Sequence, residues 1–152
     1  MLQLTPYLRQ HPRTVAAVAV AGVVLALYLR RMKVSAAVAA KLAAFPAYQR
    51  GRFSELLAEF EARGFTVVIT SGYRSGEKSL HGKWRAIDLN VVDANGKWYR
   101  MATPKAEWEA TGLPALIRAR SMRWGGDFVT PWLGLDGKMR PGYDPVHIDL
   151  GF

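Results

Sequence analysis

The chain has 152 residues, a formal net charge of +9 and no cysteine. The lack of cysteine excludes disulfides, thiolate metal sites and cysteine nucleophiles. The length suits one domain of ordinary size, and the basic charge favours polyanionic partners such as nucleic acid, anionic lipid or an acidic cell wall, without choosing among them.

The first region that stands out is an uncharged, apolar stretch over residues 14–29, bracketed by Arg13 and by the basic run 30–33. A helix of this length spans roughly 24 Å, less than the ~30 Å hydrocarbon core of a bilayer. Flanking arginines can extend toward the headgroups and make up the difference. We therefore expect residues 1–33 to contain a transmembrane or signal-anchor helix over 14–29. A cleaved signal peptide and a helix buried in a larger assembly are the alternatives.

Residues 34–50 are rich in alanine and include Pro46. This composition favours a helix-prone linker. We expect it to join the N-terminal segment to a domain over residues 51–152.

The domain is predicted to open with an amphipathic helix, because apolar residues recur at helical spacing before Gly64, which ends the pattern. Two β-branched runs, residues 65–71 and 86–92, predict strands. Along the second strand apolar and polar residues alternate, so the two kinds face opposite sides. The apolar set is Ile87, Leu89 and Val91, and the polar pair is Asp88 and Asn90.

The turn 93–96 and the residues after it predict a hairpin partner for the second strand. Thr103 followed by Pro104 predicts the start of a helix, and residues 111–120 predict another. Short strands are expected within 122–128 and 146–152. The elements together indicate an α+β domain with a small antiparallel sheet and flanking helices.

Two histidines and one aspartate in this domain form a ligand set that suits catalytic zinc. His81 and Asp88 flank a small basic turn, and His147 lies on the last predicted strand. Imidazole nitrogens and a carboxylate oxygen bind zinc and leave a fourth position for water. Asp144 is three residues before His147, so its carboxyl could reach the same site and accept a proton from that water. Asp149 shares the strand face of His147, where it would orient the imidazole. From spacing alone, a pair of structural histidines remains the alternative.

Four motifs occur in an order that resembles a known family. They are SGYRS at 71–75, SLHGKWRAIDL at 79–89, RWGGDF at 123–128 and DPVHIDL at 144–150. Together they resemble the zinc peptidases that include D-alanyl-D-alanine carboxypeptidases and phage L-alanyl-D-glutamate endolysins. The resemblance covers residues 53–152 and implies the Hedgehog/DD-peptidase fold.

The resemblance also implies roles for individual residues. His81, Asp88 and His147 would be the ligands of Zn²⁺. Asp144 would be the catalytic acid/base, and Arg74 would face the scissile carbonyl and stabilise the oxyanion, as a guanidinium with several donors can do.

Three further residues would shape the site or contact substrate. Ser79 and Asp127 would support it from their motifs. Trp84 stands where the family's motif usually has glycine, a residue that serves a backbone shape or a close approach. This departure bears on substrate fit, because both neighbouring ligands remain.

The expected function is a zinc-dependent peptidase that cuts the stem peptides of peptidoglycan, at the L-Ala–D-Glu bond, as a phage or prophage lysis enzyme. A D-Ala-D-Ala carboxypeptidase is the closest alternative. A catalytically silent domain that holds cell wall or a virion partner is an alternative of a different class. Nucleic-acid binding is disfavoured, because the sequence has no aromatic–basic motif.

The expected location is the inner membrane, reached through residues 14–29, with the catalytic domain on the periplasmic side. Positive-inside counting opposes this topology, because cations are more numerous after the stretch than before it. A weak signal-anchor that releases the domain would reconcile the two, and a virion component is the alternative. The sequence predicts no oligomeric state.

Overall fold

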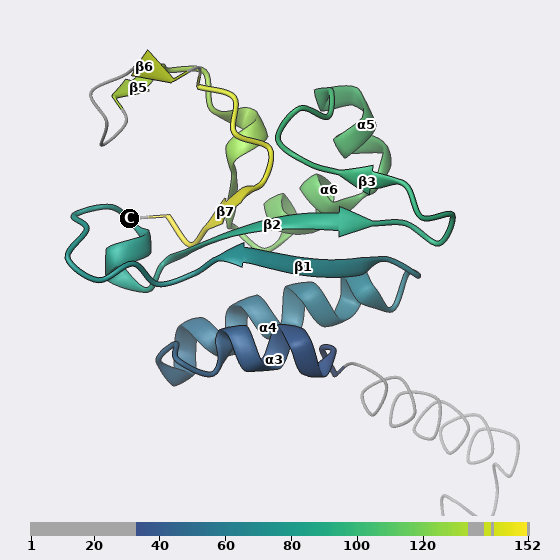
Figure 1. Cartoon of the computed structure of the whole chain (residues 1–152), viewed down its shortest axis with the longest axis horizontal. Coiled ribbons are helices and arrows are strands. Elements are labelled where there is room, and N and C mark those ends of the chain that lie inside the picture. The colour runs from purple at the N-terminus through teal and green to yellow at the C-terminus, as the bar shows by residue number, and fades with distance from the viewer. Residues whose placement is uncertain (1–32, 134–138, 141, 152) are drawn as a thin grey trace, which may run out of the picture. The chain divides into compact units, whose positions relative to one another are not determined.

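The computed structural model describes residues 33–133, 139–140 and 142–151, which belong to one compact unit (Figure 1). The apolar helix predicted over residues 14–29 lies outside the described residues. Among the residues that are described, no helix has the length and apolar character needed to cross a membrane.

A five-stranded antiparallel sheet forms the centre of this unit. The central strand is β2, which pairs with β1 along one side and with β7 and β3 along the other, while β4 pairs with β7. The five strands are β1 (Thr66–Ser71), β2 (Ala86–Val92), β3 (Trp98–Tyr99), β4 (Arg123–Trp124) and β7 (His147–Asp149). A separate pair, β5 (Trp132–Leu133) and β6 (Met139–Arg140), precedes β7 in the chain.

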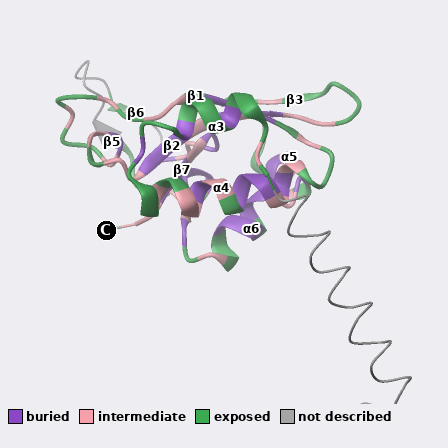
Figure 2. Cartoon of the chain, turned by 90° about the horizontal axis from the view of Figure 1, so that it is seen from below, coloured by how far each residue is buried: buried purple, intermediate pink, exposed green. Residues whose placement is uncertain are grey.

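Helices flank the sheet, so the predicted α+β class is confirmed. In the described part of the chain, the α-helices are α3 (Ala36–Leu42), α4 (Ala47–Glu61), α5 (Lys105–Ala110) and α6 (Leu113–Ala119), and the short 3-10 helices are η1 (His81–Lys83) and η2 (Gly125–Asp127). In Figure 1, α3 and α4 lie beside β1. Their buried residues, together with those of α6 and the central strands, form the core that Figure 2 shows in purple.

The alternation predicted for β2 is confirmed. Its apolar residues Ile87, Leu89 and Val91 are fully buried, while Asp88 and Asn90 face the other side and are partly exposed. Burial of the apolar face fixes the register of this strand, because a one-residue slip would move the whole set to the opposite face. The position of Asp88 on the open face is therefore a consequence of the core packing behind it.

The segment expected to be a linker is built into the domain. Helix α3 packs against α4 and β1, and Val38, Leu42 and Phe45 are buried in the core. The side chain of Ser35 caps α3 by accepting a hydrogen bond from the backbone N–H of Val38. Burial of three large side chains means that residues 36–45 stabilise the domain rather than merely connect to it.

One helix begins differently from the prediction. Helix α5 has Pro104 as its N-cap, and Thr103 does not cap it. The Thr103 hydroxyl instead accepts a hydrogen bond from the backbone N–H of Arg100 at 2.9 Å. A threonine hydroxyl readily binds a nearby backbone group in a turn, which here takes it away from the helix end.

Candidate metal centre

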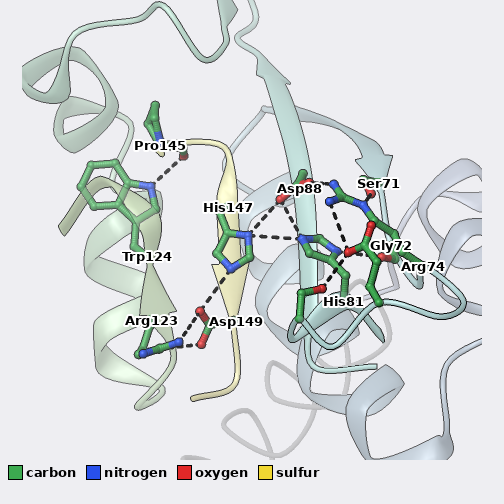
Figure 3. Close-up of polar contacts among 12 residues, drawn as sticks. Ser71, Gly72, Arg74, His81, Asp88, Arg123, Trp124, Pro145, His147 and Asp149 are labelled. Carbon is green, nitrogen blue, oxygen red and sulfur yellow. Dashed lines mark hydrogen bonds and ion pairs between the residues drawn. The ribbon is translucent and has the colours of Figure 1, made fainter. Parts of the chain in front are cut away.

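Three potential metal ligands converge from three elements on the open face of the sheet (Figure 3). Asp88 on β2 lies directly opposite His147 on β7 in the strand register, and His81 begins η1. His147 Nδ1 lies 3.0 Å and His81 Nε2 3.2 Å from the same oxygen, Asp88 Oδ1. The two ring nitrogens are 3.4 Å apart. The group can hold a metal ion, and it is the one that the sequence predicted.

The opposite nitrogen of each imidazole is engaged elsewhere, which fixes the ring's orientation. His81 Nδ1 lies 2.7 Å from the carbonyl oxygen of Gly72, to which it can only donate. His147 Nε2 lies 3.2 Å from Asp149 Oδ2. When each ring carries a single proton, on this outer nitrogen, His81 Nε2 and His147 Nδ1 both present lone pairs to Asp88. A ring that gains a second proton donates a hydrogen bond to Asp88 instead. Outer hydrogen bonds of this kind orient the histidine ligands of metal sites.

Asp149 is fully buried, and its Oδ2 contacts His147, the residue that the sequence predicted it would orient. Its two oxygens accept hydrogen bonds from Arg123 Nε at 2.7 Å and Nη2 at 2.9 Å, and the Gly151 backbone N–H donates at 2.7 Å. Burial alone would raise the pKa of Asp149, but the hydrogen bonds from His147 and Arg123 lower it. The carboxylate therefore stays ionised and holds the imidazole in place.

The charge balance at the centre favours a cation. Burial alone would raise the pKa of Asp88, but hydrogen bonds from His147 and His81 hold it below its usual range. Burial alone would lower the pKa of His147, but Asp149 and Asp88 raise it to about 9. Two carboxylates thus stabilise positive charge on this ring, and the same field would stabilise a metal ion at its Nδ1.

Arg74 supports the outer side of Asp88. Its Nη2 donates to Asp88 Oδ2 at 2.6 Å, and its Nε donates to Ser71 Oγ at 2.8 Å. The register places Ser71 opposite Asp88, beyond a bulge in β1, which brings the arginine to the ligand. Because Arg74 takes Oδ2, Oδ1 is left to face the two histidines.

Asp144 interacts electrostatically with all three ligands and has an unpaired oxygen. Its Oδ1 is buried and has no hydrogen-bond partner among the described residues. Burial raises the pKa of this carboxyl. Its backbone is fixed instead: the N–H donates to Gly125 O at 2.9 Å, and the carbonyl accepts from His147 N–H at 3.1 Å. An unsatisfied buried carboxyl calls for an explanation, and a proton-handling role provides one.

Gly125 has to be glycine for this arrangement. A Cβ there would lie 2.1 Å from the carbonyl oxygen of Asp144 and 2.9 Å from the Cβ of His147. The side chain of Trp124 further anchors the same loop, because its indole N–H donates to Pro145 O at 2.8 Å. The WGG part of the third motif thus positions the loop that carries Asp144 and His147.

Ser79 is exposed and acts within its own turn. Its hydroxyl donates to Glu77 Oε2 at 2.7 Å and lies 3.4 Å from the backbone N–H of Gly82. Glu77 in turn lies 3.8 Å from Arg74 Nη1. Ser79 therefore reaches the ligands only through two other side chains.

Asp127 is not brought to the centre. It lies on the surface, where it pairs with Lys105 at 2.8 Å and with Arg118 at 2.7 Å. Arg118 also pairs with Glu109 at 2.7 Å. We call these four side chains (Lys105, Glu109, Arg118 and Asp127) the α5–α6 ion cluster. The packing of α5 and α6 decides where this carboxylate points. The sequence of the third motif carries no sign of that packing.

Trp84 adopts the backbone conformation that explains a glycine preference. It has φ 60° and ψ 26°, in the left-handed region, where it ends η1. This conformation costs a residue with a Cβ roughly 1–2 kcal/mol. Its ring stacks on Tyr73, with centroids 3.5 Å apart and planes at 3°, and meets Phe45 edge-on. An aromatic pair contributes about 0.5–1.5 kcal/mol beyond its buried area, which is close to the cost of the conformation.

The sequence interpretation missed two groups that hold the centre, the Gly72 carbonyl and the Arg123 guanidinium. A backbone carbonyl leaves no signal in the sequence. Arg123 did leave a signal, because it begins the third motif and lies on a predicted short strand.

Comparison with known proteins identifies no family for this chain. No protein-family model matches it, and no curated protein matches it either. The assignment of a function therefore rests on the centre itself and on the resemblance of the four motifs.

Proposed function

We propose that the chain is a zinc-dependent peptidase that cuts the stem peptides of peptidoglycan. The observation that carries the proposal is the convergence of His81 Nε2, His147 Nδ1 and Asp88 Oδ1, each with its opposite side already occupied by another group. Three acceptor atoms this close together repel one another unless a proton or a metal cation lies between them. Two nitrogens and one carboxylate oxygen, with no thiolate, form a donor set that zinc hydrolases use.

Bound to these three ligands, zinc would supply the Lewis acidity that hydrolysis of an amide needs. The chain's own residues would handle the protons. Asp144 has a buried oxygen without a partner and a raised pKa, so it is suited to take a proton from water and give it to the leaving amine. The backbone hydrogen bonds of Asp144 to Gly125 and His147 would keep it beside the ligands during both steps.

Arg74 would have two tasks in this reaction. It holds Asp88 through Nη2, and its side chain is 41% exposed, so part of the guanidinium faces solvent. A substrate carbonyl on that side would meet a guanidinium with several N–H donors. Developing negative charge on the carbonyl oxygen would be stabilised there.

The substrate class rests on the resemblance to peptidoglycan peptidases and on charge. A chain with a net charge of +9 is attracted to an acidic cell wall. Within the family that the motifs resemble, we favour the L-Ala–D-Glu bond over D-Ala-D-Ala. The same substrate implies action on the wall side of a membrane, reached through residues 14–29, or delivery as part of a virion.

One observation favours the non-catalytic alternative. The large ring of Trp84 lies where the resembling family has glycine, so it fills space beside the turn between two ligands. A domain that binds wall without cutting it would tolerate such a change. The experiment below separates the two.

The test uses the purified full chain, its zinc content and its action on purified peptidoglycan. We expect zinc near one equivalent and release of peptides that stops with a chelator and resumes with added zinc. Mass spectrometry of the fragments identifies the bond, through new amino-terminal D-Glu or released D-Ala. His81→Ala serves as the inactive variant and Asp93→Asn, in the β2–β3 turn, as a control away from the centre. Zinc without fragments would favour the wall-binding alternative, and no zinc would overturn the proposal.

A further inference from the structure

The loop from Gly72 to Arg74 contacts the ligand-bearing segment through three successive residues. The Gly72 carbonyl holds His81 Nδ1, and Arg74 holds Asp88 Oδ2. Between them, the ring of Tyr73 stacks flat on the ring of Trp84. The stack thus lies in sequence between the two outer contacts that orient the first two ligands.

Trp84 occupies the point where the chain turns from one ligand to the next. Its backbone N–H donates to the carbonyl of His81 at 3.2 Å, and the N–H of Arg85 donates to Leu80 O at 2.9 Å. The left-handed conformation of Trp84 ends η1 and redirects the chain into β2, which carries Asp88. The direction in which His81 points relative to Asp88 therefore depends on the backbone angles of Trp84.

The stack also connects this turn to the core. The second contact of the Trp84 ring is Phe45, at 5.4 Å between centroids, and Phe45 meets Phe53 edge-on at 5.7 Å. Both phenylalanines are buried, with 3% and 0% exposure. Tyr73 is the outer end of this row and is 40% exposed. Phe45 also limits the loop itself, because a Cβ on Gly72 would lie 3.1 Å from its ring.

We propose that the Tyr73–Trp84 stack is a positioning device for the metal centre: it holds Trp84 in its left-handed conformation and so sets the orientation of His81. The inference rests on the metal-binding part of the proposed function. It assigns a role to the ring that departs from the resembling family's motif. Neither Tyr73 nor Trp84 is given a part in bond cleavage.

The role makes an unusual prediction for Trp84→Gly. Glycine adopts the left-handed conformation without a steric cost, so the change removes strain at the same time as it removes the stack. The metal-free variant should therefore unfold at a temperature close to that of the metal-free wild type. Its turn can move, however, so that His81 is less well oriented. Loss of an outer partner of a metal ligand typically weakens metal binding about 10–100-fold. We expect about tenfold weaker zinc binding.

The test measures the zinc dissociation constant of the full chain by competition with a chromophoric chelator. The variants are Trp84→Gly, Tyr73→Ala and their combination, with Tyr73→Phe as the conservative variant and Trp98→Ala as a distant aromatic control. Both single changes should weaken binding by a similar factor. The double variant should be no weaker than either one, because both act through the same stack. Tyr73→Phe should retain wild-type affinity, since the ring remains.

A second readout is the visible absorption of Co²⁺ bound in place of zinc, which reports ligand geometry. We expect its band to change in Trp84→Gly and Tyr73→Ala and to stay unchanged in Tyr73→Phe and Trp98→Ala. Wild-type affinity and spectrum in Trp84→Gly and Tyr73→Ala, or losses that add in the double variant, would overturn the inference while leaving the zinc peptidase proposal intact. A wild-type chain that binds neither metal would overturn both.

Discussion

The candidate metal centre and the α5–α6 ion cluster are both built from ionisable side chains, but they differ in burial and in how their charges are matched. The side chains of the cluster are between 35% and 50% exposed. Those of the centre's ligands are between 6% and 15% exposed, and the Asp149 carboxylate is fully buried. The free-energy cost of removing charge from water is therefore much larger in the centre than in the cluster.

The matching of donors and acceptors differs as well. In the cluster, both oxygens of Glu109 and both oxygens of Asp127 accept from Arg118, so each carboxylate is fully paired. In the centre, the nitrogens of two neutral imidazoles would face Asp88 Oδ1 acceptor to acceptor, so a proton or a metal cation has to lie among them, and Asp144 Oδ1 has no partner among the described residues. The ion cluster pairs all of its charges internally, so its role is to stabilise the surface of the domain. The buried centre leaves acceptor atoms that converge on one point, which is the arrangement of a cation-binding site.

Removal of one of the converging acceptors should have the largest effect on the centre. His147→Ala takes away one of three ligands, so we expect the full chain to lose zinc on dialysis. The loss should exceed the about 10–100-fold that removal of an outer partner causes. Elemental analysis after dialysis measures it. His11→Ala, at the chain's third histidine, is the control. Full zinc occupancy in His147→Ala would show that the ligands have been assigned wrongly.

The unpaired oxygen can be tested separately from the ligands. Asp144→Asn removes a proton acceptor and roughly keeps its shape, so zinc content should be unchanged. Peptide release from the wall should fall by about 10²–10⁴, the usual contribution of general acid–base catalysis. Asp127→Asn is the matched control, because it removes the same charge from the surface cluster. Activity of Asp144→Asn within a factor of a few of the wild type would remove this residue from the proposed mechanism.

The outer layer of the centre should have an intermediate effect. Asp149→Asn keeps the ligands but replaces the buried charge that accepts from His147 and Arg123. We expect zinc affinity to fall about 10–100-fold, since the imidazole is less well oriented and less basic. Chelator competition measures it, with Asp93→Asn as a control at the far end of β2. An unchanged dissociation constant would mean that backbone packing alone orients His147.

Much of the centre could be predicted from sequence because local patterns determine it. The alternation along β2 placed Asp88 on the open face, and the departure from glycine marked Trp84 as a position of special backbone shape. Both are consequences of rules that act within a few residues. The three converging ligands were also predicted, although the pairing of Asp88 with His147 links strands 59 positions apart.

What could not be predicted depends on packing between distant elements. Asp127 lies within a motif that suggested the centre, yet its partners Lys105 and Arg118 come from helices whose approach only the fold decides. The linker prediction failed to include α3 in the domain because an alanine-rich helix shows a weak apolar face. Val38 and Leu42 nevertheless provide enough buried surface to dock it.

The smallest expected effect belongs to the exposed cluster. The hydrogen bond from Arg118 is the main reason that the pKa of Asp127 is lowered to about 2. A carboxyl whose pKa is lower in the folded state than in the unfolded state stabilises the fold above its unfolded pKa of 3.8, and this contribution is lost as pH falls through about 2. Because the pairs are largely exposed, solvent screens them, and Asp127→Asn should cost at most about 1 kcal/mol.

Urea unfolding of the wild type and Asp127→Asn at pH 6 and at pH 3 would measure this effect, with the difference shrinking at the lower pH. Added salt at pH 6 should shrink it as well, because salt screens exposed charges. Zinc affinity should be the same in both proteins. A loss of several kcal/mol, or any change in zinc binding, would mean that the cluster and the centre are coupled, and that the contrast between them is smaller than their exposure indicates.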